Sequence, residues 1–391
     1  MSKHSSVFNM PSRGIVFWPV GNGDSTTFAV EKGVTIQIDL NNLYEAEDED
    51  NPHIPVIEGL IEQLPKMDGK PYLSVFVLTH PDQDHCRGFA ELLDQVKIGE
   101  LWFAPRVFRE YSRDLSEDAI CFKKEAKRRV KATIDKNGNV PSGDRVRIIG
   151  YDDLLKEEEY CGFPLSQLTV PGNEVTKLDG KNYDGIFRAF VHAPFKDDSA
   201  GERNETSIAL QITLYEGQTT LQALLFGDLA YPTLKKIFDL SKENDLSWNV
   251  MLAPHHCSKS AMYWQEEDEE EEKRKDDILN DMGNAAADSA YIISSSEPIP
   301  DSNEPGDNPP HAIARNRYQE IVSDGCFICT EEYPSEDNPE PLVFELGESG
   351  IIVPGHGNDR SKKTSVTAAV AVARGGNEPP EKRIGFGKKY D

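Results

Sequence analysis

Histidine and aspartate are concentrated in one short segment of the chain, His80-Pro81-Asp82-Gln83-Asp84-His85. Imidazole nitrogens and carboxylate oxygens together are donors that suit Zn²⁺, Mn²⁺ or Fe²⁺. The alternative is a helix cap, in which Asp82 or Asp84 accepts hydrogen bonds from backbone N–H groups. Because the segment directly follows the apolar run 73–78 and carries two histidines beside its aspartates, a metal site is favoured.

Three further motifs carry the same residue types, namely Gly21-Asn22-Gly23-Asp24, Gly227-Asp228 and Pro254-His255-His256-Cys257-Ser258. Each by itself would be an ordinary turn or a pair of core or surface histidines. Together with segment 80–85 they predict a two-ion centre, in which the Asp228 carboxylate lies between two divalent ions, Zn²⁺ or Mn²⁺. Asp24 is expected to support the site or shape the turn, without binding an ion itself.

These motifs follow apolar runs that are typical of strands. Strands are expected at 15–20, 26–30, 34–38, 73–78, 146–149, 187–191, 207–214, 221–226, 249–253, 290–294, 342–345 and 351–353. Helical spacing predicts helices at 56–64, from 85 or 88 to 95, at 234–240 and at 311–322. A strand, a turn and a helix in succession mark the place where layered α/β proteins put their chemistry.

The pattern predicts one large domain, residues 1–356, with an insertion at 105–185 and a flexible polar tail at 357–391. The insertion contains a basic amphipathic segment, 123–136, that is rich in Lys and Arg. The net charge of the whole chain is −26, which opposes non-specific binding to nucleic acid or anionic membranes. Because this basic segment could bind phosphate groups locally, the net negative charge does not exclude a phosphate-rich substrate.

Neither a membrane helix nor a signal peptide is predicted, because no apolar run is long enough for either. The six cysteines are scattered along a long chain, which is typical of reduced thiols in the cytoplasm. We therefore expect a cytoplasmic protein without a membrane partner.

The motifs and their order resemble the metallo-β-lactamase superfamily, whose signature is His-x-His-x-Asp-His. Within it the chain is most similar to the hydrolase domain of competence DNA-uptake proteins of the ComEC type. That branch replaces the second histidine with aspartate, as in His80-x-Asp82-x-Asp84-His85, and its other motifs match residues 21–24, 204–207, 227–228 and 255–258. The resemblance implies an α/β fold, an αββα four-layer sandwich with insertions.

The resemblance also implies a ligand set. His80 and Asp82 would hold the first ion, Asp84, His85 and His255 the second, and Asp228 would lie between them. Which of His255 and His256 binds metal stays open. Asn204 stands where relatives place a third histidine, so the first ion lacks a strong donor, and His192 is a substitute to consider. Cys86 and Cys257 adjoin these ligands, either as thiolate donors or, as is favoured, as small buried residues.

The predicted activity is that of a metal-dependent hydrolase, a phosphodiesterase or nuclease that uses a metal-bound hydroxide on DNA or RNA. Asp84 and His256 are the expected catalytic residues, and the expected substrate contacts are Asn204, Ser258, Lys259 and His311. Two alternatives remain open, hydrolysis of a small-molecule ester or nucleotide and a metal-binding regulatory module without turnover. A freestanding chain of this kind can also act with a protein partner in a multi-gene system.

Overall fold

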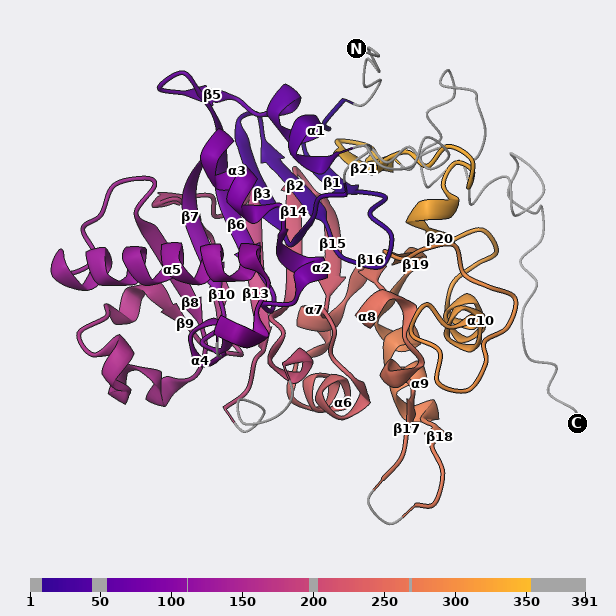
Figure 1. Ribbon diagram of the computed structural model, residues 1–391. Coiled ribbons are helices and arrows are strands. Elements are labelled where there is room, and N and C mark those ends of the chain that lie inside the picture. Colours follow the sequence, from indigo (N-terminus) through magenta and orange to yellow (C-terminus); the bar gives the residue numbers. More distant parts are fainter. Residues whose placement is uncertain (1–8, 44–54, 111, 197–202, 267–268, 353–391) are drawn as a thin grey trace, which may run out of the picture.

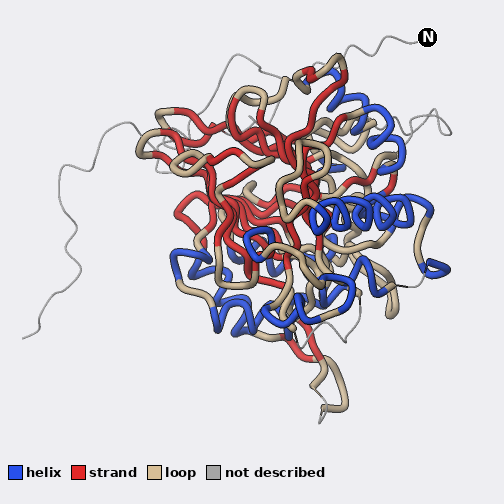
Figure 2. The backbone as a smooth tube through the Cα atoms, turned by 90° about the vertical axis from the view of Figure 1, so that its left-hand side faces the viewer, coloured by secondary structure: helices blue, strands red, loops and turns tan. Residues whose placement is uncertain are grey.

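The protein is described from a computed structural model that covers residues 9–43, 55–110, 112–196, 203–266 and 269–352. Within these ranges two large β-sheets pack face to face, and helices flank the stacked strands on both sides (Figures 1 and 2). The αββα four-layer sandwich predicted from the sequence is confirmed. The predicted tail, 357–391, lies outside the described residues.

The first sheet joins an antiparallel meander to a run of parallel strands. β1, β2 and β3 are antiparallel neighbours, whereas β3, β6, β7, β8 and β9 are parallel. Parallel strands end at the same edge of a sheet, so residues that follow β3 and β6 lie near each other. The strand order is β22 (Gly350–Ile352), β21 (Leu342–Gly347), β1 (Gly14–Phe17), β2 (Thr26–Glu31), β3 (Val34–Ile38), β6 (Lys70–Leu78), β7 (Lys97–Phe103), β8 (Arg145–Ile149) and β9 (Leu168–Thr169), with β5 (Lys66–Met67) paired to β6.

The second sheet repeats this plan with other segments. Its first strands are antiparallel, and β15, β16, β19 and β20 are parallel. The segments that follow β15 and β16 therefore leave one edge together. The strand order is β10 (Glu174–Val175), β13 (Phe187–Ala193), β14 (Ala209–Glu216), β15 (Thr219–Leu225), β16 (Trp248–Leu252), β19 (Ala286–Ser294) and β20 (Phe327–Cys329).

The helices form the two outer layers and the connections. The α-helices are α1 (Val56–Gln63), α2 (Gln83–Cys86), α3 (Phe89–Gln95), α4 (Arg106–Arg109), α5 (Glu117–Asp135), α6 (Tyr231–Leu240), α7 (Glu243–Leu246), α8 (Pro254–Cys257), α9 (Asp276–Ala285) and α10 (Ala312–Ile321). Shorter elements include β4 (Leu40–Asn41), the hairpins β11 (Lys177–Leu178) with β12 (Lys181–Asn182) and β17 (Tyr263–Trp264) with β18 (Lys273–Arg274), and the 3₁₀ turns η1 (Ser112–Asp114), η2 (Asp152–Lys156), η3 (Glu158–Tyr160), η4 (Leu165–Gln167), η6 (Asn204–Thr206), η7 (Lys259–Ala261) and η8 (Thr330–Glu332).

Three apolar clusters correspond to the three interfaces between these layers. The central one is built from the inward faces of both sheets, for example Ile36 and Val77 against Val191 and Val250. The other two lie between each sheet and its helices, with Phe76 and Phe122 in the first and Leu224 and Ile237 in the second. Because each sheet is covered on both faces, central parallel strands such as β6 are buried and largely apolar.

Residues 105–185 contribute to the layers themselves. β8 and β9 extend the first sheet, and α5 packs on its outer face through Phe122, Ala126 and Val130. The basic segment 123–136 therefore belongs to a covering helix, which Figure 1 shows extending away from α2. No helix in the described part of the chain has the length and apolar character needed to span a bilayer.

Candidate metal centre

Segment 79–85 leaves β6 at the edge where β3 also ends. After Leu78 the chain turns, Asp82 precedes the short helix α2, and the buried His85 lies within that helix. The backbone of Asp39, the residue after β3, donates from its N–H to the Val77 carbonyl at 2.9 Å. The two strand ends are thus held side by side, as their parallel pairing requires.

The second sheet contributes Asp228 from the turn after β15. Gly227 has φ +53°, and a Cβ atom at this position would lie 2.9 Å from Cβ of Ser207. Glycine therefore lets the turn approach Ser207, whose hydroxyl accepts a hydrogen bond from the Asp228 N–H at 3.3 Å. The Asp228 side chain is consequently buried between the two sheets.

The segment after β16 has an unusual backbone. His255, His256 and Cys257 all have positive φ, at 50°, 52° and 63°. This left-handed region costs a residue with a Cβ atom about 1–2 kcal/mol, and such strain persists only where surrounding contacts impose it. The contacts here include a bond from the His255 N–H to the Gly227 carbonyl at 3.0 Å. The strained turn brings both histidine rings close to Asp228.

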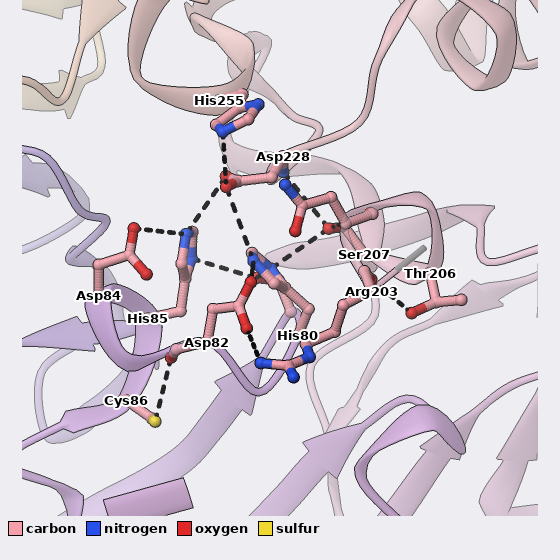
Figure 3. A network of polar contacts seen from close by, with 12 residues as sticks. His80, Asp82, Asp84, His85, Cys86, Arg203, Thr206, Ser207, Asp228 and His255 are labelled. Atoms are coloured by element: carbon pink, nitrogen blue, oxygen red, sulfur yellow. Dashed lines mark hydrogen bonds and ion pairs between the residues drawn. The ribbon is translucent and has the colours of Figure 1, made fainter. Parts of the chain in front are cut away.

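The four-donor cluster consists of Asp84, His85, Asp228 and His256, whose ligand atoms all lie within 4.8 Å of one another. His85 Nε2 lies 3.2 Å from Asp228 Oδ1, and His256 Nε2 lies 3.2 Å from Asp84 Oδ2. Figure 3 shows His80, His85 and Asp228 turned toward one another. Asp84 and His85 follow a strand of the first sheet, and Asp228 and His256 follow strands of the second.

Several of these buried atoms have no hydrogen-bond partner in the described structure. They are Nε2 of His80, His85 and His256 and Oδ1 of Asp228. Buried polar atoms are nearly always paired, so convergent orphans of this kind require an unseen partner. Two imidazoles and two carboxylates match the donors that Zn²⁺ or Mn²⁺ takes, and the residues present therefore fit a divalent ion.

Hydrogen bonds at the far side of each ring set its tautomer. His85 Nδ1 lies 2.8 Å from Asp39 Oδ2 and His256 Nδ1 lies 3.1 Å from the Ser295 carbonyl, and both oxygens can only accept. His80 Nδ1 contacts the hydroxyls of Thr79 and Ser207, whose own hydrogens go to Asp39 Oδ2 and the Asn204 carbonyl. Each Nδ1 therefore carries the hydrogen, which leaves each Nε2 lone pair directed toward the cluster.

Asp39 was not among the sequence-predicted site residues. Its Oδ1 accepts from the Thr79 N–H at 2.8 Å and its Oδ2 accepts from His85. A carboxylate behind a metal-binding histidine fixes the ring and makes it a stronger donor. The available signal was an acidic residue directly after the strand 34–38, at the same sheet edge as His80 after the next parallel strand.

The charges within the cluster stabilise one another. Burial opposes a charge on His256, but attraction to Asp228 and the nearby Asp84 carboxylate raise its pKa to about 9. His85 likewise has its pKa raised well above 6.5, since Asp228 and Asp39 outweigh burial. Burial also works against charge on Asp228, yet the neighbouring His85 and His256 hold the pKa of Asp228 well below its usual range. The cluster therefore stabilises both the negative charge of Asp228 and the positive charges placed beside it.

Asp24 and Asp82 occupy different sides of the centre. Asp24 is buried beside His256, with Oδ1 3.6 Å from Nδ1, and burial raises its pKa to about 6. Asp82 lies at the opposite side, where Oδ2 is 3.5 Å from His80 Nε2 and Oδ1 pairs with the guanidinium of Arg203. Arg203 was not predicted, because it reaches Asp82 across 121 positions of sequence.

The predicted metal ligand His255 lies at the rim. Its side chain is 27% exposed and its Nε2 is 3.6 Å from Asp228 Oδ2, whereas His256 is buried within the four-donor cluster. Burial lowers the pKa of His255, so the ring is neutral near pH 7. The geometry therefore assigns the inner position to His256 and the outer one to His255.

The predicted substrate contacts are engaged in local structure. The Ser258 hydroxyl caps η7 by accepting from the Ser260 N–H, and Lys259 pairs with Glu272 of the β17–β18 connection. His311 accepts from the Lys259 N–H and its other ring nitrogen faces the Asp307 carbonyl. Asn204 accepts through its backbone carbonyl from Ser207. These residues brace the loops around the centre.

His192 and the two cysteines lie outside the donor set. His192 has its ring nitrogens on Ser241 Oγ and the Asp245 carbonyl, and burial lowers its pKa to about 4. Cys86, the last residue of α2, is buried, and burial raises its pKa to about 12. Burial also raises the pKa of Cys257. Both thiols are therefore protonated core residues, and His192 does not complete a second ligand set.

No protein-family model and no curated protein sequence matches the chain. Several solved structures do match the chain. An archaeal metallo-β-lactamase superfamily protein from Sulfolobus tokodaii is 16% identical, with 60% of this chain and 78% of that chain covered and a TM-score of 0.27.

Two other similar structures are also of this superfamily. MEM-A1, a subclass B3 metallo-β-lactamase from a soil metagenome library, is 11% identical over 62% of this chain and 77% of that chain, with a TM-score of 0.33. SMB-1, solved with 2-mercaptoethanesulfonate, is 11% identical over 62% and 78%, with a TM-score of 0.30. The likeness is partial, and the metal centre described above rests on its own donor atoms.

Proposed function

We propose that the chain is a metal-dependent hydrolase that cleaves phosphodiesters. The observation that carries this proposal is the convergence of buried, unpaired donor atoms from both sheets, Nε2 of His85 and His256 and Oδ1 of Asp228, beside the Asp84 carboxylate. A divalent ion bound there acts as a Lewis acid and lowers the pKa of a coordinated water. We expect this ion to be Zn²⁺ or Mn²⁺.

The exposure of each side chain around the cluster indicates the role proposed for it. The Asp84 side chain is 33% exposed, so it borders the open side where water and substrate arrive. Its carboxylate is placed to orient the attacking water and to accept its proton. His255, at the rim and neutral, is suited to contact the substrate.

Support for a phosphodiester, and for nucleic acid in particular, comes from the motif order shared with the DNA-uptake hydrolases. The structure adds an observation that favours a smaller phosphodiester. Within the basic segment, Arg128 pairs with Glu125 and Asp144, and Arg129 is buried against Glu125. Part of the positive charge on α5 is therefore neutralised within the protein, which weakens the attraction of this helix for a long polyanion.

The test is hydrolysis of a generic phosphodiester, a dinucleotide, and single-stranded and duplex DNA, each with Zn²⁺ or Mn²⁺. The wild-type chain should hydrolyse at least one of them, and D84A and H85A should lose more than about 100-fold in rate. D153A, which alters an exposed aspartate on η2, is the matched control. Equal rates for D84A and wild type would exclude the proposal. Preference for the dinucleotide over DNA would select the smaller substrate.

A further inference from the structure

The two sides of the centre differ in how completely they are built. The four-donor cluster closes within 4.8 Å, whereas His80 and Asp82 belong to no such group among the described residues. His80 Nε2 is 3.5 Å from Asp82 Oδ2 and 3.7 Å from Asp228 Oδ2. Asn204, which stands in the position of a third donor, offers only a neutral amide side chain, which is a poor metal ligand. A second ion would therefore meet few donors on this side.

A cation of the chain already lies on this side. The Arg203 guanidinium pairs through Nη1 with Asp82 Oδ1, and Figure 3 shows it beside Asp82 and His80. Its Nη2 lies 3.1 Å from the Asp114 carbonyl and 3.4 Å from Glu110 Oε2. Arg203 thus joins three segments, the turn before α2, the region after α4 and the start of η6. A guanidinium fixed by several partners is always charged.

We propose that Arg203 takes the place of the second metal ion, so that the chain binds one divalent ion in the four-donor cluster. The guanidinium pairs with Asp82, and among the described residues Asp82 and Asp228 do not form one donor group with His80. A fixed positive charge on this side also repels a second cation. Arg203 is a positioning residue, because it acts through Asp82. This inference rests on the metal centre proposed above.

The test is metal stoichiometry, measured by equilibrium dialysis against Zn²⁺ followed by elemental analysis. The wild-type chain should bind about one ion. R203A removes the competing cation and leaves Asp82 free beside His80 and Asp228, so its stoichiometry should rise toward two. R203K keeps a positive charge and should stay at one. R109A is the matched control, since Arg109 is 27% exposed and pairs with Glu157 away from the cluster.

A second variant tests the inference without altering Arg203. D82N should keep about one ion at nearly wild-type affinity, because Asp82 pairs with Arg203 and does not bind the ion. D84N should lose that ion. If Asp82 is instead the ligand of a second ion, the wild type will hold two and D82N only one.

The outcomes separate this inference from the proposed function. Two ions in the wild-type chain, or an R203A chain that remains at one, would overturn the role of Arg203 and leave the hydrolase intact. A wild-type chain that retains no metal would overturn both. Circular dichroism shows whether each variant is folded. If R203A is unfolded, the metal content of D82N decides the test.

Discussion

Oδ2 of Asp39 accepts a hydrogen bond from Nδ1 of His85 at 2.8 Å. Asp39 directly follows β3, and His85 lies in α2, after the neighbouring parallel strand β6. The same carboxylate accepts from the backbone and hydroxyl of Thr79. One buried aspartate therefore fixes both the strand end and the ring that faces the centre. It determines which nitrogen of His85 is free to bind a metal ion.

Replacing Asp39 should weaken metal binding although Asp39 does not touch the ion. We expect D39N to lower the affinity for Zn²⁺ by about 10- to 100-fold, because the His85 ring loses the acceptor that orients it. Competition with a chromophoric chelator measures this. D179N is the control, since Asp179 is a mostly buried aspartate that pairs with Arg145 elsewhere. An unchanged affinity in D39N would contradict the role assigned to Asp39.

The two adjacent histidines should differ in their effect on metal binding. H256A removes a member of the four-donor cluster, whereas H255A removes a ring at the rim. We expect metal content after dialysis to fall sharply in H256A and to change little in H255A. Turnover should fall in both variants, since H256A loses the proposed metal ion and H255A loses the proposed substrate contact. Metal loss confined to H255A would restore the assignment made from sequence.

Metal affinity should increase with pH up to about 9. In the metal-free chain the pKa of His256 is raised from 6.5 to about 9, so the ion must displace a proton at lower pH. Each released proton changes the apparent affinity by up to about tenfold per pH unit, and the curve flattens above the pKa. Chelator competition from about pH 7 to about pH 10 tests this. A flat profile would contradict it.

The same shift has a defined sign for stability. The folded-state pKa of His256 is raised, so the protonated ring stabilises the metal-free fold fully below about pH 6.5. This contribution is lost as the pH rises through about 9. Urea titrations of metal-free protein should show the midpoint decreasing over that window, and the H256A variant should show a smaller decrease. Equal decreases in both proteins would show that another group is responsible.

Gly227 should be far less tolerant of a side chain than another glycine of similar conformation. Gly217, in the β14–β15 hairpin, has φ +58° and open space where a Cβ atom would be. G217A should therefore cost only the backbone strain of about 1–2 kcal/mol. G227A adds a contact of 2.9 Å with Ser207, and we expect at least about 1 kcal/mol more in denaturant titrations. Equal destabilisation would show that Ser207 moves freely.

The fold and the strand-end location of the centre could be predicted because they depend on local patterns. The run 73–78 is apolar apart from Ser74, as expected of a strand covered on both faces, and His80 to His85 follow it after Thr79. The parallel sheet then brings such ends together. Asp39 has the same position after β3, but a single acidic residue without a neighbouring histidine gave no distinguishing signal.

The distinction between His255 and His256 could not be predicted from the sequence. Which ring faces inward depends on three consecutive left-handed residues, and these are imposed by contacts with Gly227 and Ser295 from other strands. Arg203 was missed for a related reason, because its partner Asp82 lies on another loop. Tertiary contacts determine these side-chain positions, and the local spacing of residues in the sequence does not reveal such contacts.

The four donors are divided between the halves of the chain, with Asp84 and His85 in the first sheet's connection and Asp228 and His256 in the second's. During synthesis a nascent chain that stops before Asp228 holds only half of the ligand set, although β10, β13, β14 and β15 of the second sheet have already been made. Metal can therefore be captured only after the second half has emerged and docked, which makes loading a late step in the maturation of the protein.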